Sequence, residues 1–304
     1  MDAYFLVSGV ETPLWLPPLA AFVISYFTSM GGVSGAVLLL PFQMSVLGFT
    51  SPAVSPTNMV FNIIAIPGGV YRHWREGRML WPLTAMVVAG SIPGVIAGGF
   101  IRLAYLPDPK PFKVFVGAVL LYIGVRMLWD FLKGPGKTGV LPPDPRISGD
   151  LWKAKTLEFS WRKHIFEFQG NVYKSGTLGI FVLSLIVGVV GGVYGIGGGA
   201  IMAPVFIAIY SFPVHAIAGA VLMGTFITSI VGVLFYELIA PLYETSLLAV
   251  SPNWALGALF GLGGMIGIYL GTTTQRFVSA KWLKLMLGVL LLSVAVRYII
   301  GYFS

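Results

Sequence analysis

Long apolar runs separated by short polar segments follow one another along most of the chain. Most are at least as long as the roughly 20 residues that a helix needs to cross the hydrocarbon core of a bilayer. They cover residues 14–48, 52–71, 79–105, 112–132, 176–210, 213–240, 253–275 and 280–302. The pattern predicts an all-α, multi-pass membrane protein.

Two of these runs are too long for one simple span and contain glycines near their middle. The first contains "GVSGAVLLLP" at 32–41, and the second contains "GIGGGAIMAP" at 195–204. Glycine has no Cβ, so it lets the backbone leave the helical conformation. Each run is therefore expected to form a helix pair or a broken helix.

The two glycine phrases belong to an internal repeat. At their offset of 163 residues, the segment 49–62 also lies over 212–225 without a gap. Three glycines spaced four residues apart recur in the same order in both halves: Gly90, Gly94 and Gly98, then Gly263, Gly267 and Gly271. We therefore predict a first transmembrane repeat at 1–132 and a second at 176–304.

A polar linker, residues 133–175, separates the two repeats. Its first part is rich in proline and glycine, which excludes a continuous helix. Further along, residue types alternate around Gly170-Asn171, a turn signal. We expect a small β hairpin outside the membrane there.

The distribution of basic residues predicts which loops face the cytoplasm. Fourteen of nineteen Lys and Arg residues fall in 72–78, 133–175 and 276–284. Cytoplasmic loops carry an excess of such residues, so we place these segments inside and both termini outside. Arg102, Lys110 and Lys113 are an exception on the outer side.

With this orientation, each repeat crosses the membrane an odd number of times, so the second copy is inverted relative to the first. Three crossings with a re-entrant region and five crossings both satisfy this parity. We favour five, which gives about ten helices with broken glycine-rich helices near the midplane.

Composition narrows the functional class. The chain is 57% hydrophobic and only 10% charged, with a mean hydropathy of +0.87, whereas soluble domains carry about 25% charged residues. The net charge of +8 follows membrane sidedness rather than any nucleic-acid-binding motif. There is no cysteine, and the three histidines are scattered over the chain without a catalytic or metal-binding spacing. We expect no enzyme activity, no cofactor, no metal and no nucleic-acid partner.

The glycine phrases and the polar residues within spans are the candidate binding site. Inverted repeats are common in secondary transporters, whose broken helices direct positive N-termini at anionic substrates near the midplane. Polar side chains inside spans are costly and tend to be functional. The candidate substrate contacts are Ser34, Gly35, Gln43, Asn58, Asn62, Gly197, Gly198, Gly199 and Thr225. The alternatives are close helix packing for the glycines and interhelical hydrogen bonds for the polar side chains.

Three further residues are candidates for an entrance or gate. Arg126 and Arg297 correspond to each other in the two repeats, and His215 lies at a predicted helix start. The alternative for the two arginines is that they snorkel to the membrane surface, and for His215 an interfacial role.

The doubled glycine phrases leading to Pro41 and Pro204, the glycine runs and the duplicated layout resemble the sulfite exporter TauE/SafE family. The second phrase is close to the family pattern, whereas the first has serine and alanine where glycines are usual. The resemblance implies a permease for a small sulfur-containing anion such as sulfite, a sulfonate or sulfoacetate, in a bacterial inner membrane.

The function expected is therefore secondary transport by alternating access, in which one repeat moves against the other. A passive anion channel is the alternative. The expected partners are the small anion, with or without a coupling ion, and the lipid bilayer. The sequence is compatible with both a monomer and a homodimer.

Overall fold

The computed structural model describes residues 2–30, 33–132, 154–160, 162–243, 248–274 and 280–303. The helices of the first half are α1 (Leu16–Met30), α2 (Gly35–Ser45), α3 (Val54–Ala65), α4 (Pro67–Arg75), α5 (Trp81–Ala104) and α6 (Pro109–Leu132). Those of the second half are α7 (Thr177–Tyr194), α8 (Met202–Tyr210), α9 (Val214–Tyr243), α10 (Trp254–Thr274) and α11 (Ala280–Phe303). The strands are β1 (Asp2–Phe5), β2 (Val10–Pro13), β3 (Lys155–Phe159), β4 (His164–Phe168) and β5 (Asn171–Ser175).

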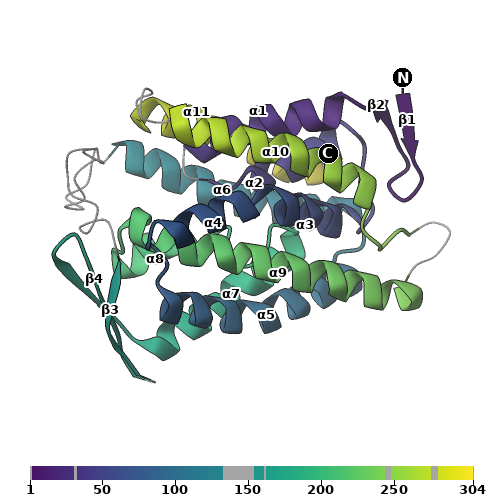
Figure 1. The fold of residues 1–304 in the computed structure, drawn as a ribbon. Coiled ribbons are helices and arrows are strands. Elements are labelled where there is room, and N and C mark those ends of the chain that lie inside the picture. Colours follow the sequence, from purple (N-terminus) through teal and green to yellow (C-terminus); the bar gives the residue numbers. More distant parts are fainter. Residues whose placement is uncertain are drawn as a thin grey trace.

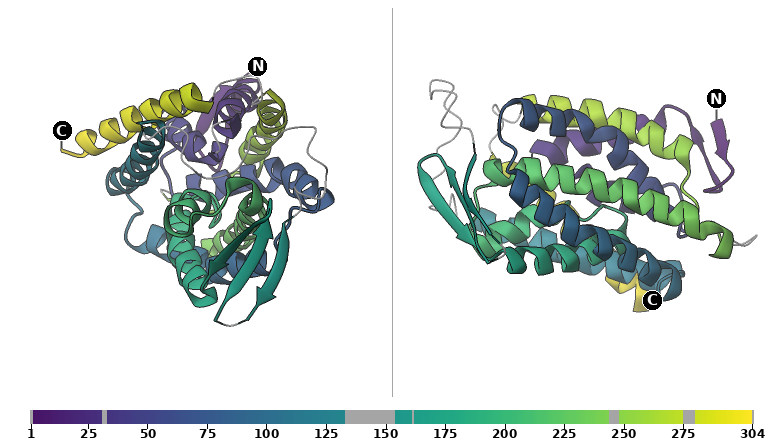
Figure 2. Two further views of the ribbon diagram at one scale, coloured as in Figure 1. Left: turned by 90° about the vertical axis from the view of Figure 1, so that its left-hand side faces the viewer. Right: turned by 60° about the horizontal axis from the view of Figure 1, so that its bottom comes forward.

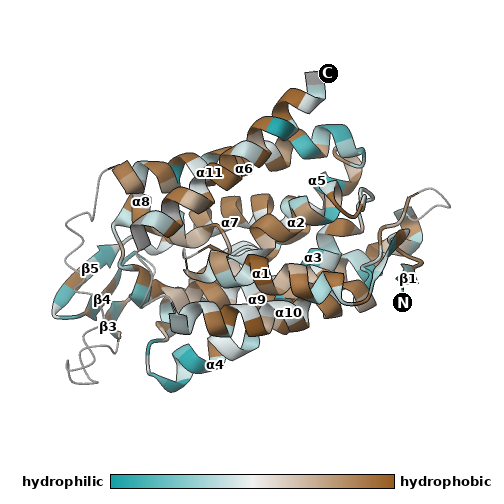
Figure 3. Ribbon diagram, turned by 90° about the horizontal axis from the view of Figure 1, so that it is seen from above, coloured by the Kyte–Doolittle hydropathy of each residue, from teal (hydrophilic) through white to brown (hydrophobic). Residues whose placement is uncertain are grey.

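The helices form one elongated bundle (Figure 1). Among the described residues, six helices are long and apolar enough to cross a membrane: α5, α6, α7, α9, α10 and α11. Large apolar side chains are exposed on the outer faces, for example Leu238 on α9 and Leu178 on α7. Hydrophobic residues dominate the helices, and hydrophilic ones gather at the strands and at α4 (Figure 3). The prediction of a mostly helical, multi-pass membrane protein is confirmed, with six membrane-length helices among the described residues.

Each of the two overlong apolar runs is a pair of helices. α1 ends at Met30 and α2 begins at Gly35, whereas α7 ends at Tyr194 and α8 begins at Met202. Gly195 ends α7 with a φ of +88°, and Gly197 has a φ of +75°. Side chains other than glycine rarely adopt this left-handed conformation, so the glycine phrase is what allows the chain to leave one helix and enter the next.

The two halves differ in their third helical region. In the second half, α9 runs without interruption for 30 residues. In the first half the corresponding chain is split between Ala65 and Pro67 into α3 and α4. Pro67 has no N–H to continue the backbone ladder, which accounts for the split, although Ile66 before it keeps helical backbone angles.

The helices of the two halves interlock. α1 packs against α10, and the corresponding helices of the other half, α7 and α5, also pack against each other. α3 packs on α10 as α9 packs on α5, and α6 lies along α11. Figure 1 shows the pairs α1/α10 and α5/α7 along opposite sides of the bundle.

The spaced glycines are the contact surfaces of these pairs. A Cβ on Gly94 would lie 2.9 Å from the Cα of Gly188 on α7 and closer still to the carbonyl oxygen of Leu185. On α10, Gly267 faces the backbone of Phe22 on α1 in the same way. Small residues let helix backbones approach this closely in membranes, so close helix packing is the role of these glycines.

The predicted hairpin in the linker is confirmed as β4 and β5, with residues 133–153 lying outside the described part of the chain. Its turn is centred on Gln169 and Gly170, one residue earlier than expected, and both have positive φ, as a type I′ turn requires. A third strand, β3, pairs with β4. Phe166 of β4 packs edge-to-face against Phe212 before α9, with ring centroids 5.0 Å apart.

A second hairpin, formed by β1 and β2, was not predicted. The three-stranded sheet lies across one end of the bundle and this hairpin lies at the other (Figures 1 and 2). We call these the sheet end and the hairpin end.

Replacing Gly94 by alanine should destabilise the protein. The new methyl would meet α7 backbone atoms that cannot rotate away, and overpacking of this kind costs about 1–3 kcal/mol. The control is Gly301→Ala on α11, where a Cβ meets nothing within 4 Å. Thermal unfolding in detergent should show a lower midpoint for the Gly94 variant alone, and equal midpoints would contradict the packing role.

Candidate functional site

The two helix breaks meet at one buried asparagine on α3. The side-chain Nδ2 of Asn58 donates to the carbonyl of Ala36, at the start of α2, and to that of Gly195, after α7, both at 3.0 Å. The hydroxyl of Tyr194 also donates to the carbonyl of Val37, at 2.7 Å. Residues that lie far apart in sequence are thus joined across the two halves.

A second asparagine continues this contact one helical turn further along α3. The Nδ2 of Asn62 donates to the carbonyl of Ile196 at 3.1 Å and to the Oγ of Ser229 at 3.3 Å. Asn58 and Asn62 are four residues apart, so they share one helix face. That face is directed at the second glycine phrase.

Several acceptor atoms around this contact have no hydrogen-bond partner. Gln43 donates its Nε2 to the Oδ1 of Asn58 at 3.2 Å, which leaves its own Oε1 unpartnered. Asn62 Oδ1 and Ser25 Oγ are also unpartnered, and all three side chains are fully buried. Native proteins satisfy most buried polar atoms, so these oxygens mark a place suited to a bound water, cation or protonated group.

Backbone donors lie beside these acceptors. Ser34 caps α2, and its Oγ accepts from the N–H of Ala36 at 3.3 Å. The N–H of Gly198 donates to Thr228 Oγ1 at 2.9 Å. Within the described residues, the N–H groups of Gly35 and Gly199 make no hydrogen bond. Free N–H groups at the start of a helix favour anions.

The glycine phrases are closed in this conformation. A Cβ on Gly198 would lie 2.5 Å from the Cβ of Ser91, and one on Gly199 would meet the hydroxyl of Thr225. The side chain of Ser25 packs directly on Gly35. Most of the predicted contact residues are therefore brought together in a tightly packed core, with Ser34 only half-buried, and a solute could enter only if the surrounding helices move apart.

The three predicted gate residues lie apart from this core. Arg126 lines a surface hollow on α6 with Tyr122 and Trp129, and Arg297 is exposed on α11. His215 lies at the sheet end, near His73 and Arg78. The proximity of His73 and His215 was not expected from their distance in sequence.

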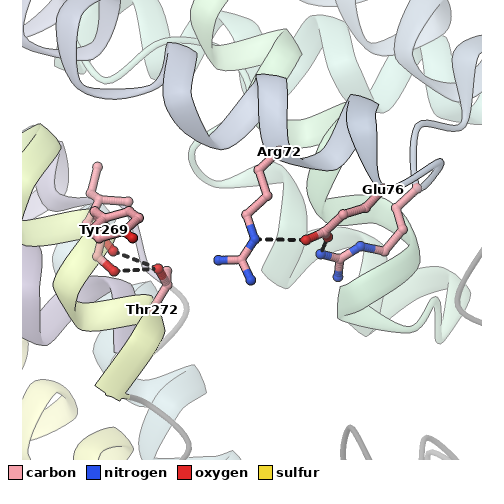
Figure 4. Close-up of polar contacts among 6 residues, drawn as sticks. Arg72, Glu76, Tyr269 and Thr272 are labelled. Atoms are coloured by element: carbon pink, nitrogen blue, oxygen red, sulfur yellow. Dashed lines mark hydrogen bonds and ion pairs between the residues drawn. The ribbon is translucent and has the colours of Figure 1, made fainter. Parts of the chain in front are cut away.

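A small ion-pair network is found in the same region as His215. Glu76 accepts from the Nε of Arg72 at 2.9 Å and also pairs with Arg78 (Figure 4). The network is partly exposed, and exposed ion pairs contribute only about 0–1 kcal/mol. It therefore helps to fix the turn between α4 and α5 rather than forming a second site.

Several residues of the core were not predicted from the sequence. Ser25 packs on Gly35, Ser229 bonds Asn62, and Tyr194 bonds the carbonyl of Val37 on α2, but the sequence pattern singled out none of the three. Tyr194 directly precedes the second phrase, and this position was a signal that could have been used. Ser25 and Ser229 are ordinary small polar residues within helices, and only the packing of the helices brings them to the breaks.

Comparison with known proteins gives one family and several relatives. The family described as "Sulfite exporter TauE/SafE" matches residues 18–298. "Probable membrane transporter protein y4hK" of Sinorhizobium fredii is 23% identical over 90% of this chain and 93% of its own length. "Probable membrane transporter protein YjnA" of Bacillus subtilis is 22% identical over 90% of this chain and 95% of its own. No solved structure matches the chain.

Replacing Asn58 by leucine should destabilise the protein. Leucine keeps the branching and the number of side-chain heavy atoms but leaves the carbonyls of Ala36 and Gly195 without their donor, and a buried group left unpaired costs about 1–3 kcal/mol. The control is Thr272→Val, which removes a hydroxyl that bonds only within α10, to the carbonyls of Ile268 and Tyr269 (Figure 4). Thermal unfolding in detergent should separate the two variants, and an unchanged midpoint for Asn58→Leu would show that the bridge contributes nothing.

Proposed function

The chain belongs to the sulfite exporter TauE/SafE family of membrane transporters, and we propose that it is a secondary transporter of a small sulfur-containing anion. Sulfite, a sulfonate and sulfoacetate are the candidate substrates, and a bacterial inner membrane is the proposed location. The observation that carries the proposal is the meeting of both helix breaks at Asn58.

The proposed substrate site lies between the two breaks. The N–H groups of Gly35 and Gly199 and the hydroxyl of Ser34 are the donors available to a sulfonate or sulfite oxygen. Thr225 Oγ1 donates to the carbonyl of Val221 at 3.0 Å, so Thr225 reaches the anion only by exchanging this bond. Gly197 and Gly198 supply the irregular backbone, which is tolerated inside a membrane only where it is buried in protein or lines a cavity. In this role the start of each short helix, α2 and α8, directs its positive end at the anion.

The unpartnered oxygens suit a coupling cation better than they suit the anion. Gln43 Oε1 and Asn62 Oδ1 carry partial negative charge, which would repel an oxyanion. Oxygen atoms of this kind bind hard cations or accept a proton-bearing group. We therefore assign the donors to the substrate and these two acceptors to a coupling ion.

The interlocked helices support an inverted repeat. Helix α7 corresponds to α1, and α5 corresponds to α10. Swapping the two halves therefore turns the pair α1/α10 into the pair α7/α5. α5 follows α4 at the sheet end, whereas α9 ends at the hairpin end (Figure 1). The equivalent connections of the two repeats thus lie at opposite ends of the bundle, as an inverted second copy requires. The repeats are proposed at 1–132 and 176–304, with the linker in the cytoplasm.

The same packing changes the motion expected. If one repeat moved against the other as a rigid body, the backbone contacts at Gly94 and Gly267 would have to break. We propose instead that the pairs α1/α10 and α5/α7 move as units relative to each other. The closed glycine phrases are then an occluded state, which opens to one side at a time as these pairs tilt.

Counterflow in proteoliposomes tests the function. Vesicles loaded with unlabelled sulfite or sulfoacetate should take up the labelled anion faster than empty vesicles, because only a carrier shows acceleration by substrate on the far side. A passive channel would give equal initial rates. The thermal midpoint should also rise with the preferred anion, since binding at 100 times Kd adds about 2.7 kcal/mol.

In the same assay, Ser34→Ala should weaken the apparent substrate affinity about tenfold, the equivalent of one hydrogen bond to an anion. The control is Asn253→Ala, which also removes a helix N-cap, the bond from the N–H of Leu256 to Asn253 Oδ1. Each cap contributes about 1 kcal/mol to stability. Equal affinities for both variants would remove Ser34 from the substrate site.

Cysteine labelling tests the inverted repeat. The chain has no native cysteine, so Arg75→Cys and Leu242→Cys each introduce one exposed thiol at equivalent ends of the two repeats. A membrane-impermeant maleimide should label Leu242→Cys from outside and Arg75→Cys only after the membrane is opened. Labelling of both from the same side would exclude the inverted topology.

A further inference from the structure

A buried arginine near the hairpin end has no counter-ion among the residues that the structure describes. Arg102, near the end of α5, is fully buried. One guanidinium nitrogen, Nη1, donates to the carbonyl of Leu106, and the guanidinium lies 3.8 Å from the ring centroid of Phe112. Nε and Nη2 have no hydrogen-bond partner, and no carboxylate of the described residues forms an ion pair with this guanidinium.

A buried tyrosine faces the same place from another helix. Tyr236 of α9 is fully buried, and its hydroxyl has no hydrogen-bond partner of ordinary geometry. It is within electrostatic reach of Arg102 and lies beside the hydroxyl of Ser55. The neighbouring carboxylate, Glu237, is directed elsewhere and accepts from Trp254 Nε1 at 2.6 Å.

Ser55 connects this pair to the second helix break. Its Oγ donates to the carbonyl of Val193 at 3.3 Å, and a Cβ on Gly195 would lie 2.5 Å from its Cα. At the other side, Tyr236 packs with Leu103 and Val250. Val250 belongs to the segment whose Asn253 bonds Ser8 of the β1–β2 turn, at 3.0 Å. Arg102, Tyr236 and Ser55 therefore lie in a polar line from the hairpin end towards Gly195.

Burying a charge without a counter-ion costs free energy. A buried ion normally pairs with an opposite charge, and Arg presents its N–H groups in a fork that matches the oxygens of an oxyanion. Tyr236 adds a hydroxyl donor to the same place. The unpartnered polar groups here, Arg102 Nε and Nη2 and the Tyr236 hydroxyl, can all donate, and a small oxyanion supplies the acceptor oxygens that they lack.

We infer that Arg102 and Tyr236, with Ser55 on the path inward, form a second anion-binding station, which holds the sulfur oxyanion between the hairpin end and the break at Gly195. This inference rests on the proposed function, because it assigns the station to the same solute. The station differs from the central site in using a full positive charge rather than helix N-termini.

The decisive variant is Tyr236→Phe. Among the described residues its hydroxyl makes no hydrogen bond of ordinary geometry and has only the Ser55 hydroxyl beside it, so removing it should change the thermal midpoint without anion by little. If the hydroxyl binds the anion, apparent affinity for sulfite or sulfoacetate should fall about tenfold in counterflow and in thermal-shift titration. The matched control, Tyr243→Phe on the same helix, should change neither measurement.

A second variant, Arg102→Lys, keeps the charge but loses the fork, and affinity should fall further than in Tyr236→Phe. If this variant fails to fold, Tyr236→Phe alone decides. Wild-type affinity in Tyr236→Phe, with Ser34→Ala impaired, would overturn the station while leaving the central site intact. Absence of counterflow and of any anion-dependent stabilisation in the wild-type protein would overturn the proposed function and the station together.

Discussion

One side-chain amide fixes the positions of the two helix breaks relative to each other. Asn58 has a single NH₂ group, and both of its hydrogens are used, one on the carbonyl of Ala36 and one on that of Gly195. In a bilayer no water reaches such carbonyls, so helix ends at this depth need a partner from the protein. Because that partner lies on a third element, α3, neither break can shift without breaking a bond to it. The closed arrangement of the core follows from this bridge.

The glycine stripes determine what can move around the bridge. On α5 and α10 they bring backbone against backbone, and contacts without side chains have no flexible atoms to absorb a relative displacement. The breaks are different, because Asn58, Asn62 and Thr228 contact them through single hydrogen bonds, each worth little net free energy. A transition between states is therefore expected to exchange the hydrogen bonds at the breaks while preserving the glycine-packed pairs.

The sequence alone was sufficient for the helices, the breaks and the linker hairpin, because each depends on local signals: apolar length, glycine at positive φ, and a turn dipeptide. It also grouped Asn58 and Asn62 with the glycine phrases as candidate contacts, because polar side chains inside spans tend to be functional. It could not predict that α1 pairs with α10 rather than with its own repeat, since that choice depends on shape complementarity between distant surfaces. Ser25 and Tyr236 were missed for the same reason, and Arg102 was noted only as a basic residue on the outer side, because its burial depends on the packing of distant segments.

The buried charge of Arg102 explains why an anion would bind inside so apolar a protein. Within the described spans, Arg102 is a fully buried cation, and the other donors available are amides and hydroxyls whose partial charges do not need neutralising. An anion binding at Arg102 relieves a desolvation cost that the empty protein bears, whereas an anion at the breaks gains only from partial charges. Binding is therefore expected to be stronger at the station than at the centre. A cation at Gln43 and Asn62 would raise affinity at the centre by direct attraction, so coupling to a cation is the simplest way for the anion to leave the station and move inward.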